Sequence, residues 1–62
     1  MNETQAYINK LIDGDTKNIP YLSEKIGVDY NTIYYWYRGK HAMKDWQLKM
    51  FKFWYESFYP ND

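Results

Sequence analysis

The sequence predicts a small all-α domain, a compact bundle of four to five short helices. Three observations predict it. Apolar side chains recur at spacings of three and four residues, which places them on one face of a helix. Isolated glycines at positions 14, 27 and 39 separate these stretches, as glycine does where a helix stops or turns. Aromatic residues make up 23% of the chain, and large rings supply the burial that 62 residues otherwise lack. We expect one domain over residues 1–62.

The composition narrows the function classes. The chain has no cysteine, which excludes disulfides and thiolate metal sites. Residues 1–11 lack the apolar core of a signal peptide, and no apolar run is long enough to span a bilayer, so we expect a cytoplasmic protein without a membrane partner. No carboxylate lies at a ligand spacing from the single histidine, His41. We therefore expect no metal, no cofactor, no small-molecule substrate and no enzymatic activity.

The first helix is expected from about Glu3 to Ile12, with Ile8, Leu11 and Ile12 forming its apolar stripe. The sequence Asp13-Gly14-Asp15 is typical of a helix stop, because glycine adopts the left-handed conformation of a cap. A short polar loop from Thr16 to Asn18 should follow.

Two short helices are expected next, over Pro20–Ile26 and Tyr30–Arg38, with Gly27 at the corner between them. Each helix has one small apolar stripe, formed by Leu22 and Ile26 in the first and by Ile33 and Trp36 in the second. Asn18 and Asp29 can cap the two helices, since their side-chain oxygens accept backbone N–H groups. Gly39 should end the second helix.

The segment from Ile19 to Lys40 resembles the helix-turn-helix of phage repressor and Cro-type transcription factors. The resemblance rests on Leu22, Ser23 at a small-residue position, Ile26-Gly27-Val28, Ile33, Trp36 and Arg38-Gly39-Lys40. It implies a lambda-repressor-like fold and a sequence-specific regulator of transcription, a Cro-type repressor in a bacterial or phage-infected cell. It also implies a homodimer that places two recognition helices about 34 Å apart in the major groove of a palindromic operator.

The last helix is expected from about Lys44 to Tyr59, after a loop over Lys40–Met43, and Pro60 should end it. Its apolar arc is wide. Leu48, Phe51, Trp54, Tyr55 and Phe58 fall together on a helical wheel, and Trp46, Met50 and Phe53 extend the arc sideways. These three residues either belong to a generous core or form a homodimer contact, and we expect the dimer, because exposed rings of that size rarely stay uncovered.

If double-stranded DNA is the partner, the outward face of the Tyr30–Arg38 helix should read the bases. Asparagine can pair with adenine and arginine with guanine, while tyrosine can touch a thymine methyl group or a phosphate. The candidates for base readout are Tyr30, Asn31, Tyr34, Tyr35 and Arg38. The alternatives are a cap or solvated surface for Asn31 and Arg38 and aromatic packing for the tyrosines. Tyr30 and Tyr37 lie at the edges of this face, where each either reaches phosphate or packs on a neighbouring helix.

Candidates for phosphate contacts flank that helix. They are Lys17 and Asn18 before the first motif helix, and Lys40, His41 and Lys44 after the second. The alternative for each lysine is a side chain that keeps a small surface soluble.

The net charge of zero argues against a nucleic-acid binder, but the charge is unevenly distributed. Residues 25–52 carry six basic and two acidic side chains, a net charge of +4, while each flank carries −2. This distribution and the motif spacing favour DNA binding. The alternative is a protein-interaction module on the same frame, an antirepressor or a host-protein inhibitor, because Tyr34, Tyr35, Tyr37 and Arg38 also have the composition of an interaction hot spot.

Overall fold

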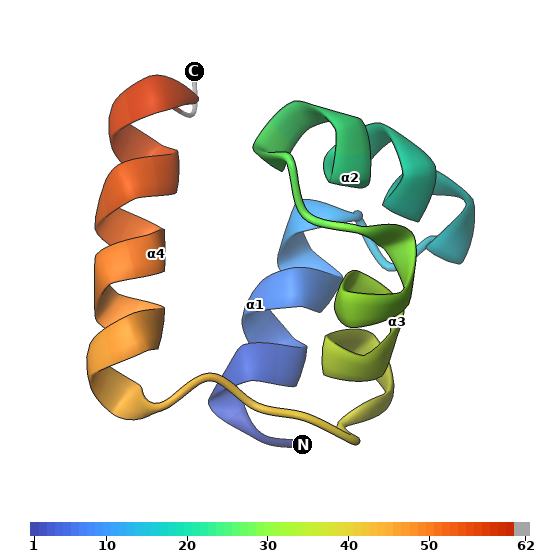
Figure 1. Ribbon diagram of the computed structural model, residues 1–62, viewed down its shortest axis with the longest axis horizontal. Coiled ribbons are helices and arrows are strands. Elements are labelled where there is room, and N and C mark those ends of the chain that lie inside the picture. The colour runs from blue at the N-terminus through green and yellow to red at the C-terminus, as the bar shows by residue number, and fades with distance from the viewer. Residues whose placement is uncertain (61–62) are drawn as a thin grey trace.

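Four α-helices joined by short turns make up residues 1–60, the part of the chain that the computed structural model describes (Figure 1). The elements are α1 (Glu3–Leu11), the 3₁₀ turn η1 (Thr16–Asn18), α2 (Ile19–Ile26), α3 (Tyr30–Arg38) and α4 (Asp45–Phe58). No strand occurs within these residues, and the Cα positions span 26 × 25 × 19 Å. The prediction of a compact all-α bundle is confirmed.

A reciprocal pair of hydrogen bonds starts α1. The side-chain oxygen of Asn2 accepts the backbone N–H of Gln5 at 2.7 Å, and the side-chain oxygen of Gln5 accepts the backbone N–H of Asn2 at 2.9 Å. The helix ends at Leu11, one residue earlier than predicted, because the chain turns left-handed at Asp13 (φ 59°) and Gly14 (φ 71°). Ile12 lies outside the helix but is fully buried.

The entry to α2 differs from the prediction. The expected polar loop is the turn η1, and α2 begins at Ile19 instead of Pro20. Asn18 does not cap α2 with its side chain, so that prediction is wrong. Its backbone is already helical (φ −86°, ψ −5°) because η1 runs directly into α2, and its amide nitrogen donates to the carbonyl of Ile12 at 2.8 Å. Asp15 caps η1 instead, accepting the backbone N–H of Lys17 at 2.9 Å.

The corner between α2 and α3 follows the prediction. Gly27 has a φ of 72°, which side chains with a Cβ atom rarely adopt, and its N–H donates to the carbonyl of Ser23 at 2.9 Å. The hydroxyl of Ser23 donates to the carbonyl of Val28 and so ties the corner to α2. Asp29 caps α3, accepting the backbone N–H of Thr32 at 3.2 Å and its hydroxyl at 2.7 Å. These hydrogen bonds from Thr32 lower the pKa of the Asp29 carboxyl below its usual value.

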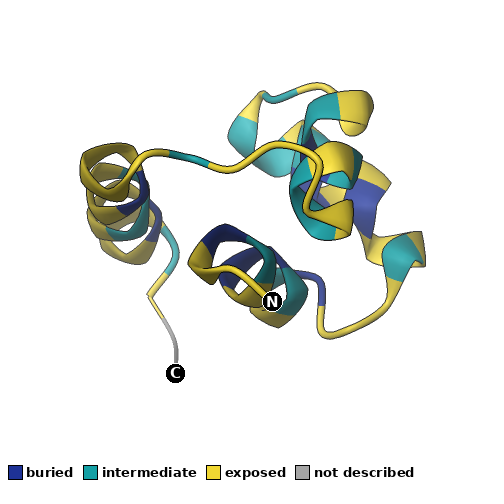
Figure 2. Cartoon of the chain, turned by 90° about the horizontal axis from the view of Figure 1, so that it is seen from below, coloured by how far each residue is buried: buried dark blue, intermediate teal, exposed yellow. Residues whose placement is uncertain are grey.

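The core lies where the four helices face one another (Figure 2). In Figure 1, α1 stands between α3 on one side and α4 on the other. Each helix contributes apolar side chains to this interior. The buried cluster consists of Ile8, Ile12, Ile19, Leu22, Ile33 and Tyr55.

One side of α4 packs against α1, and the helix begins and ends one residue inside the predicted limits. Leu48 and Tyr55 are buried, and the half-buried ring of Phe51 meets the ring of Tyr7 edge-on at 5.9 Å between the centroids. The face that meets α1 is narrower than the apolar arc of the helical wheel. As a result Phe58 is 67% exposed, although its ring lies against that of Trp54 at 5.6 Å.

Candidate nucleic-acid interface

The helix α3 is fixed at both ends, which determines the orientation of its outer face. Asp29 caps its start, and Ile33 in its middle is fully buried. At its end, Gly39 adopts a φ of 81°, and the side-chain amide of Gln5 from α1 donates to the carbonyl of Tyr37 at 3.4 Å. A Cβ atom on Gly39 would lie 2.6 Å from that amide nitrogen, so the two elements meet where only glycine leaves room. The outer side chains of α3 therefore project from a helix with a defined position.

Tyr30, Tyr34 and Arg38 form one row along α3, because they are four residues apart. The rings of Tyr30 and Tyr34 stack at 6.1 Å with an interplanar angle of 12°. A guanidinium nitrogen of Arg38 donates to the hydroxyl of Tyr34 at 3.1 Å. Tyr34 is half-buried and packs against the core, whereas Tyr30 is 43% exposed and Arg38 is exposed. Tyr34 thus supports and orients the arginine at the end of the row.

A second set of predicted residues gathers around Tyr35. Its ring is 38% exposed, and the ring of His41 meets it edge-on at 5.4 Å. The side-chain nitrogen of Lys40 lies 5.7 Å from the centre of the same ring. Asn31, one turn earlier on α3, is exposed. The structure therefore brings two predicted phosphate contacts, Lys40 and His41, beside a predicted base contact.

Tyr37 belongs to the interior side of α3. It is half-buried and packs against the core cluster. Of the two roles that the sequence allows for Tyr37, the structure favours packing.

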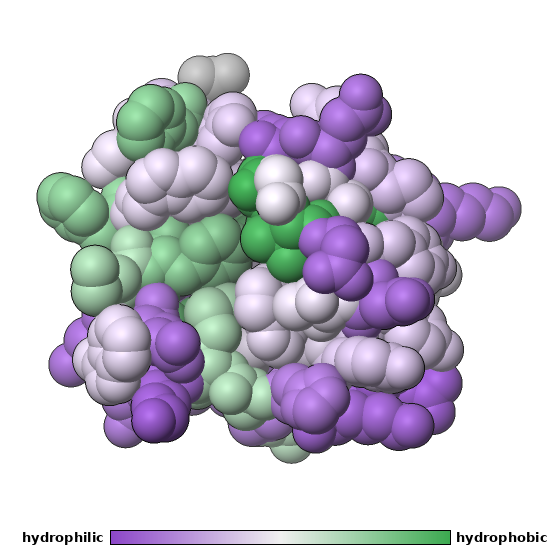
Figure 3. Space-filling model, in the orientation of Figure 1, coloured by the Kyte–Doolittle hydropathy of each residue, from purple (hydrophilic) through white to green (hydrophobic). Residues whose placement is uncertain are grey.

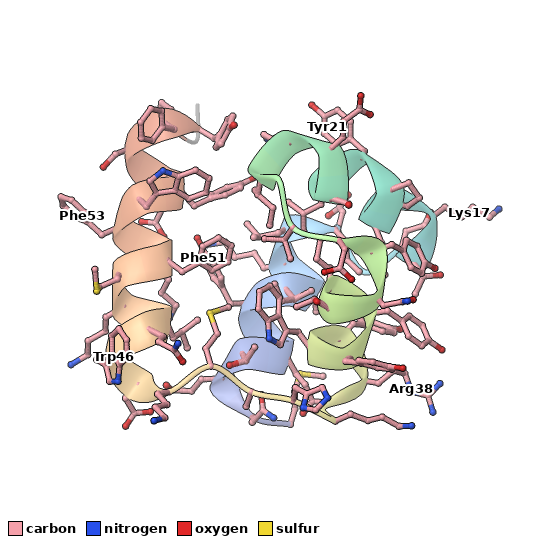
Figure 4. The ribbon with its side chains drawn as sticks, in the orientation of Figure 1. Lys17, Tyr21, Arg38, Trp46, Phe51 and Phe53 are labelled. Atoms are coloured by element: carbon pink, nitrogen blue, oxygen red, sulfur yellow. The ribbon has the colours of Figure 1, made fainter. Side chains whose placement is uncertain are left out.

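The remaining predicted phosphate contacts differ in position. Figure 4 places the side chain of Lys17 at the same edge of the molecule as Arg38. The side-chain amide of Asn18 already donates to Ile12, so it is partly engaged within the protein. Lys44 precedes α4 and makes no side-chain cap, and its backbone N–H donates to the side-chain oxygen of Gln47 at 3.0 Å. The start of α4 lies at the far end of the loop that leaves α3 (Figure 1), so Lys44 does not join the group around Arg38.

The basic excess counted along residues 25–52 does not gather on α3. Lys25 faces α4, where its ammonium group donates to the hydroxyl of Tyr55 at 3.1 Å and lies 4.3 Å from the centre of the Tyr59 ring. The hydrogen bond with Tyr55 raises the pKa of Lys25. Lys52 lies over the ring of Tyr7, 5.2 Å from its centre. Of the six basic residues, Arg38 and Lys40 belong to α3 or follow it directly, so the local positive charge is lower than the sequence indicates.

Figure 4 shows Trp46 and Phe53 at the edge of the molecule opposite to Lys17 and Arg38. The three residues that were predicted for a dimer contact are all exposed, Trp46 by 59%, Met50 by 64% and Phe53 by 77%. In Figure 3 the upper part of the surface over α4 is hydrophobic and its lower part is hydrophilic, as is the lower edge of the α3 side. The candidate DNA face and the candidate dimer face are on opposite sides of the protein.

Sequence reasoning missed Gln5, which positions the end of α3. Its signal was present, because an asparagine followed three residues later by glutamine is the spacing of a capping box. The contact of Gln5 with Gly39 has no such local signal, since the two residues are far apart in the sequence.

A pocket of about 210 Å³ lies between α1, α2 and α4. Its lining includes Tyr7, Lys10, Lys25, Tyr55 and Glu56. The hydroxyl of Tyr7 donates to the carboxylate of Glu56 at 3.3 Å. Burial and the nearby negative charge of Glu56 raise the pKa of Tyr7 to about 12. This pocket is separate from the outer face of α3.

Within residues 1–60, no three His, Cys, Asp or Glu side chains are grouped as a metal ion would require. Nor does this described part of the chain contain a helix with the length and apolar character needed to cross a membrane. Comparisons with protein-family models, curated proteins and solved structures found no match. The outer face of α3 is thus the feature on which a functional proposal rests.

Proposed function

We propose that this protein binds double-stranded DNA, with the outer face of α3 entering the major groove. The observation that carries the proposal is the position of Arg38, which is exposed at the end of a fixed helix and is held by the hydroxyl of Tyr34 at 3.1 Å. An arginine oriented in this way is suited to a guanine edge, because its remaining N–H groups can donate to two acceptors side by side.

The dimensions of α3 fit a major groove. An α-helix with its side chains is about 10–12 Å across, and the groove is about 12 Å wide, so the nine residues of α3 can lie in it. Asn31, Tyr35 and Arg38 would approach the base edges, where asparagine suits adenine and a tyrosine ring suits the thymine methyl group. Tyr30, at the start of the row, would lie near the wall of the groove.

Few phosphate contacts accompany this helix. Lys17 lies at the same edge of the molecule as Arg38, and Lys40 and His41 lie beside Tyr35. Each neutralised phosphate contributes about 0.9 to the slope of log affinity against log salt, so two or three contacts give a slope of roughly −2 to −3. With a net charge of zero, we expect weak nonspecific binding that is detectable at low salt.

The finer role follows from the resemblance of residues 19–40 to Cro-type proteins. We propose a regulator of transcription that acts as a repressor by occupying its DNA site. A dimer formed through the α4 surface would not place two recognition helices on one palindromic operator, because this surface faces away from Arg38.

The test is a fluorescence-anisotropy titration of a labelled random-sequence duplex at low and at moderate salt. On this random-sequence duplex we expect binding at low salt that weakens with added salt, and weaker binding for Arg38→Ala, because that change removes one of the few positive charges on the outer face of α3. Lys10→Ala is the matched control, because it removes one positive charge from the pocket between α1 and α4. No binding at low salt, or equal losses for the two variants, would refute the proposal. Circular dichroism of both variants checks that the fold is intact.

One observation favours a second candidate, a protein partner for the same face. The stacked rings of Tyr30 and Tyr34, next to the exposed ring of Tyr35 and to Arg38, form an ordered aromatic surface of the kind found in interaction hot spots. The same titration separates the two candidates, since a protein-binding face predicts no affinity for the duplex even at low salt.

A further inference from the structure

The exposed apolar residues of α4 follow the spacing of a helix-pairing seam. Trp46, Met50 and Phe53 are separated by four and then three residues, and Ser57 follows after four more. This alternation places all four residues in one stripe, on the side opposite the buried Leu48 and Tyr55. A stripe with this repeat can interdigitate with a second helix.

We propose that a second copy of this chain covers the stripe, with the two α4 helices packed antiparallel about a two-fold axis. In this arrangement Met50 packs on the partner's Phe53, and Trp46 packs beside the partner's Ser57. The two-fold axis repeats each contact, so the small side chain of Ser57 faces the large ring of Trp46 at both ends of the paired helices.

Charge complementarity favours a second copy of this chain as the partner and an antiparallel orientation of the two α4 helices. Lys49 and Glu56 flank the stripe on the same side of α4, seven residues apart. When Met50 lies on the partner's Phe53 in an antiparallel pair, Lys49 comes next to the partner's Glu56, and the symmetry repeats this ion pair. A parallel pair would instead bring Lys49 beside the partner's Trp54. On the other flank of the antiparallel pair, the same register brings Trp54, which is 38% exposed, beside the partner's Gln47.

The length of α4 limits the area of this contact. A single helix of 14 residues gives an interface at the small end of the range for specific complexes. We therefore expect a dissociation constant on the order of 10–100 µM, which makes dimer formation dependent on the protein concentration.

The dimer has a consequence for DNA, and this part rests on the proposed function. Trp46 and Phe53 lie at one end of the longest axis and Arg38 lies at the other (Figure 4). One protomer extends 26 Å along that axis, so pairing through α4 places the two α3 surfaces roughly 50 Å apart and facing in opposite directions. Two recognition helices on one palindrome need a separation of about 34 Å on one side of the duplex. The dimer would instead bridge two DNA segments.

Sedimentation velocity without DNA tests the dimer, at protein concentrations from about 10 µM to about 1 mM, which bracket the expected dissociation constant. The wild-type chain should convert from monomer to dimer over this range, and Phe53→Lys should stay monomeric. Lys49→Glu and Glu56→Lys should each weaken the dimer, and the double variant should restore it, because the ion pair is re-formed with its charges exchanged. A wild-type chain that stays monomeric, or a double variant no better than the single ones, would overturn the proposal.

Glu56 also accepts a hydrogen bond from Tyr7, and Glu56→Lys removes it. The double variant lacks the same hydrogen bond, so comparing it with Glu56→Lys isolates the effect of the ion pair. Thermal unfolding of every variant shows whether the monomer is folded.

A second measurement tests the bridging. Two duplexes, one with a donor and one with an acceptor fluorophore, are mixed with protein above the dissociation constant of the dimer. The wild-type chain should bring the labels together. Phe53→Lys should abolish the energy transfer but retain binding to a single duplex, and Arg38→Ala should weaken both. Transfer that is unchanged in Phe53→Lys would overturn the bridging. A dimer that binds no duplex at all would refute the proposed function and leave the α4 pairing in place.

Discussion

The side-chain nitrogen of Lys25 lies 4.3 Å from the centre of the Tyr59 ring, and the hydroxyl of Tyr59 donates to the backbone carbonyl of Lys25 at 2.9 Å. Lys25 of α2 thus contacts both the ring face and the hydroxyl of Tyr59, the residue that follows α4. Tyr55, one turn earlier, accepts a hydrogen bond from the same ammonium group. These contacts attach the last turn of α4 to α2, in a region where Phe58 contributes little burial.

Tyr59→Phe should lower the free energy of unfolding by about 1 kcal/mol, because it removes one hydrogen bond and keeps the ring over Lys25. Tyr21→Phe is the matched control. Its ring lies 5.6 Å from the same nitrogen, but Tyr21 is 67% exposed, so its hydroxyl is already in water and the change should be close to zero. Urea denaturation measures both variants. Equal effects would contradict the role of the Tyr59 hydroxyl.

Gly39→Ala should destabilise the protein more than Gly27→Ala does. Both glycines have a positive φ, of 81° and 72°, so alanine costs about 1 kcal/mol at either position from backbone strain alone. A Cβ atom at Gly27 meets nothing within 4 Å, whereas one at Gly39 lies 2.6 Å from the side chain of Gln5. Gln5 must then move, and it loses its hydrogen bonds to Tyr37 and Asn2.

The excess cost at Gly39 is therefore specific to Gln5. In a Gln5→Ala background the difference between Gly39→Ala and Gly27→Ala should shrink, which a double-mutant cycle measures by thermal unfolding. A difference that is unchanged in this background would show that another contact is responsible.

Stability should fall in alkaline solution because of Tyr7. Its pKa is raised to about 12 in the folded protein by burial and by Glu56, against an ordinary value near 10 in the unfolded chain. The folded state holds the proton more tightly, so this contribution is fully present below pH 10 and is lost as the pH rises through 12. Denaturation of the wild-type chain and of Tyr7→Phe on both sides of pH 10 isolates the effect. A variant with the same alkaline loss as the wild-type chain would contradict it.

Local features of the sequence predicted much of the fold. The corner at Gly27, the cap at Asp29 and the limits of α3 depend on neighbouring residues, so their signals lie within a few positions. The capping role of Asn18 failed because an asparagine caps only where the backbone is extended, and the turn η1 makes it helical there. That conformation depends on how the loop returns from α1.

Contacts between residues that are far apart in the chain could not be predicted from the sequence. A count of charges along residues 25–52 includes Lys25 and Lys52, which the fold turns toward Tyr59 and Tyr7 instead of toward α3. The packing of α1 between α3 and α4 places Arg38 and Phe53 at opposite edges, and periodicity within each helix carries no information about that. The candidate residues were therefore predicted individually, while their grouping came from the fold.

The proposed contact between the outer face of α3 and DNA can be observed residue by residue. The most direct measurement is a titration of the isotope-labelled protein with a short duplex at low salt, followed by the backbone amide resonances in nuclear magnetic resonance spectra. We expect shifts that grow with added DNA at Lys17 and across residues 30–41, and that diminish when salt is added. We expect little change at Trp46, Met50 and Phe53 at protein concentrations where the chain is monomeric. Spectra that do not change at low salt, or shifts confined to α4, would contradict the claim.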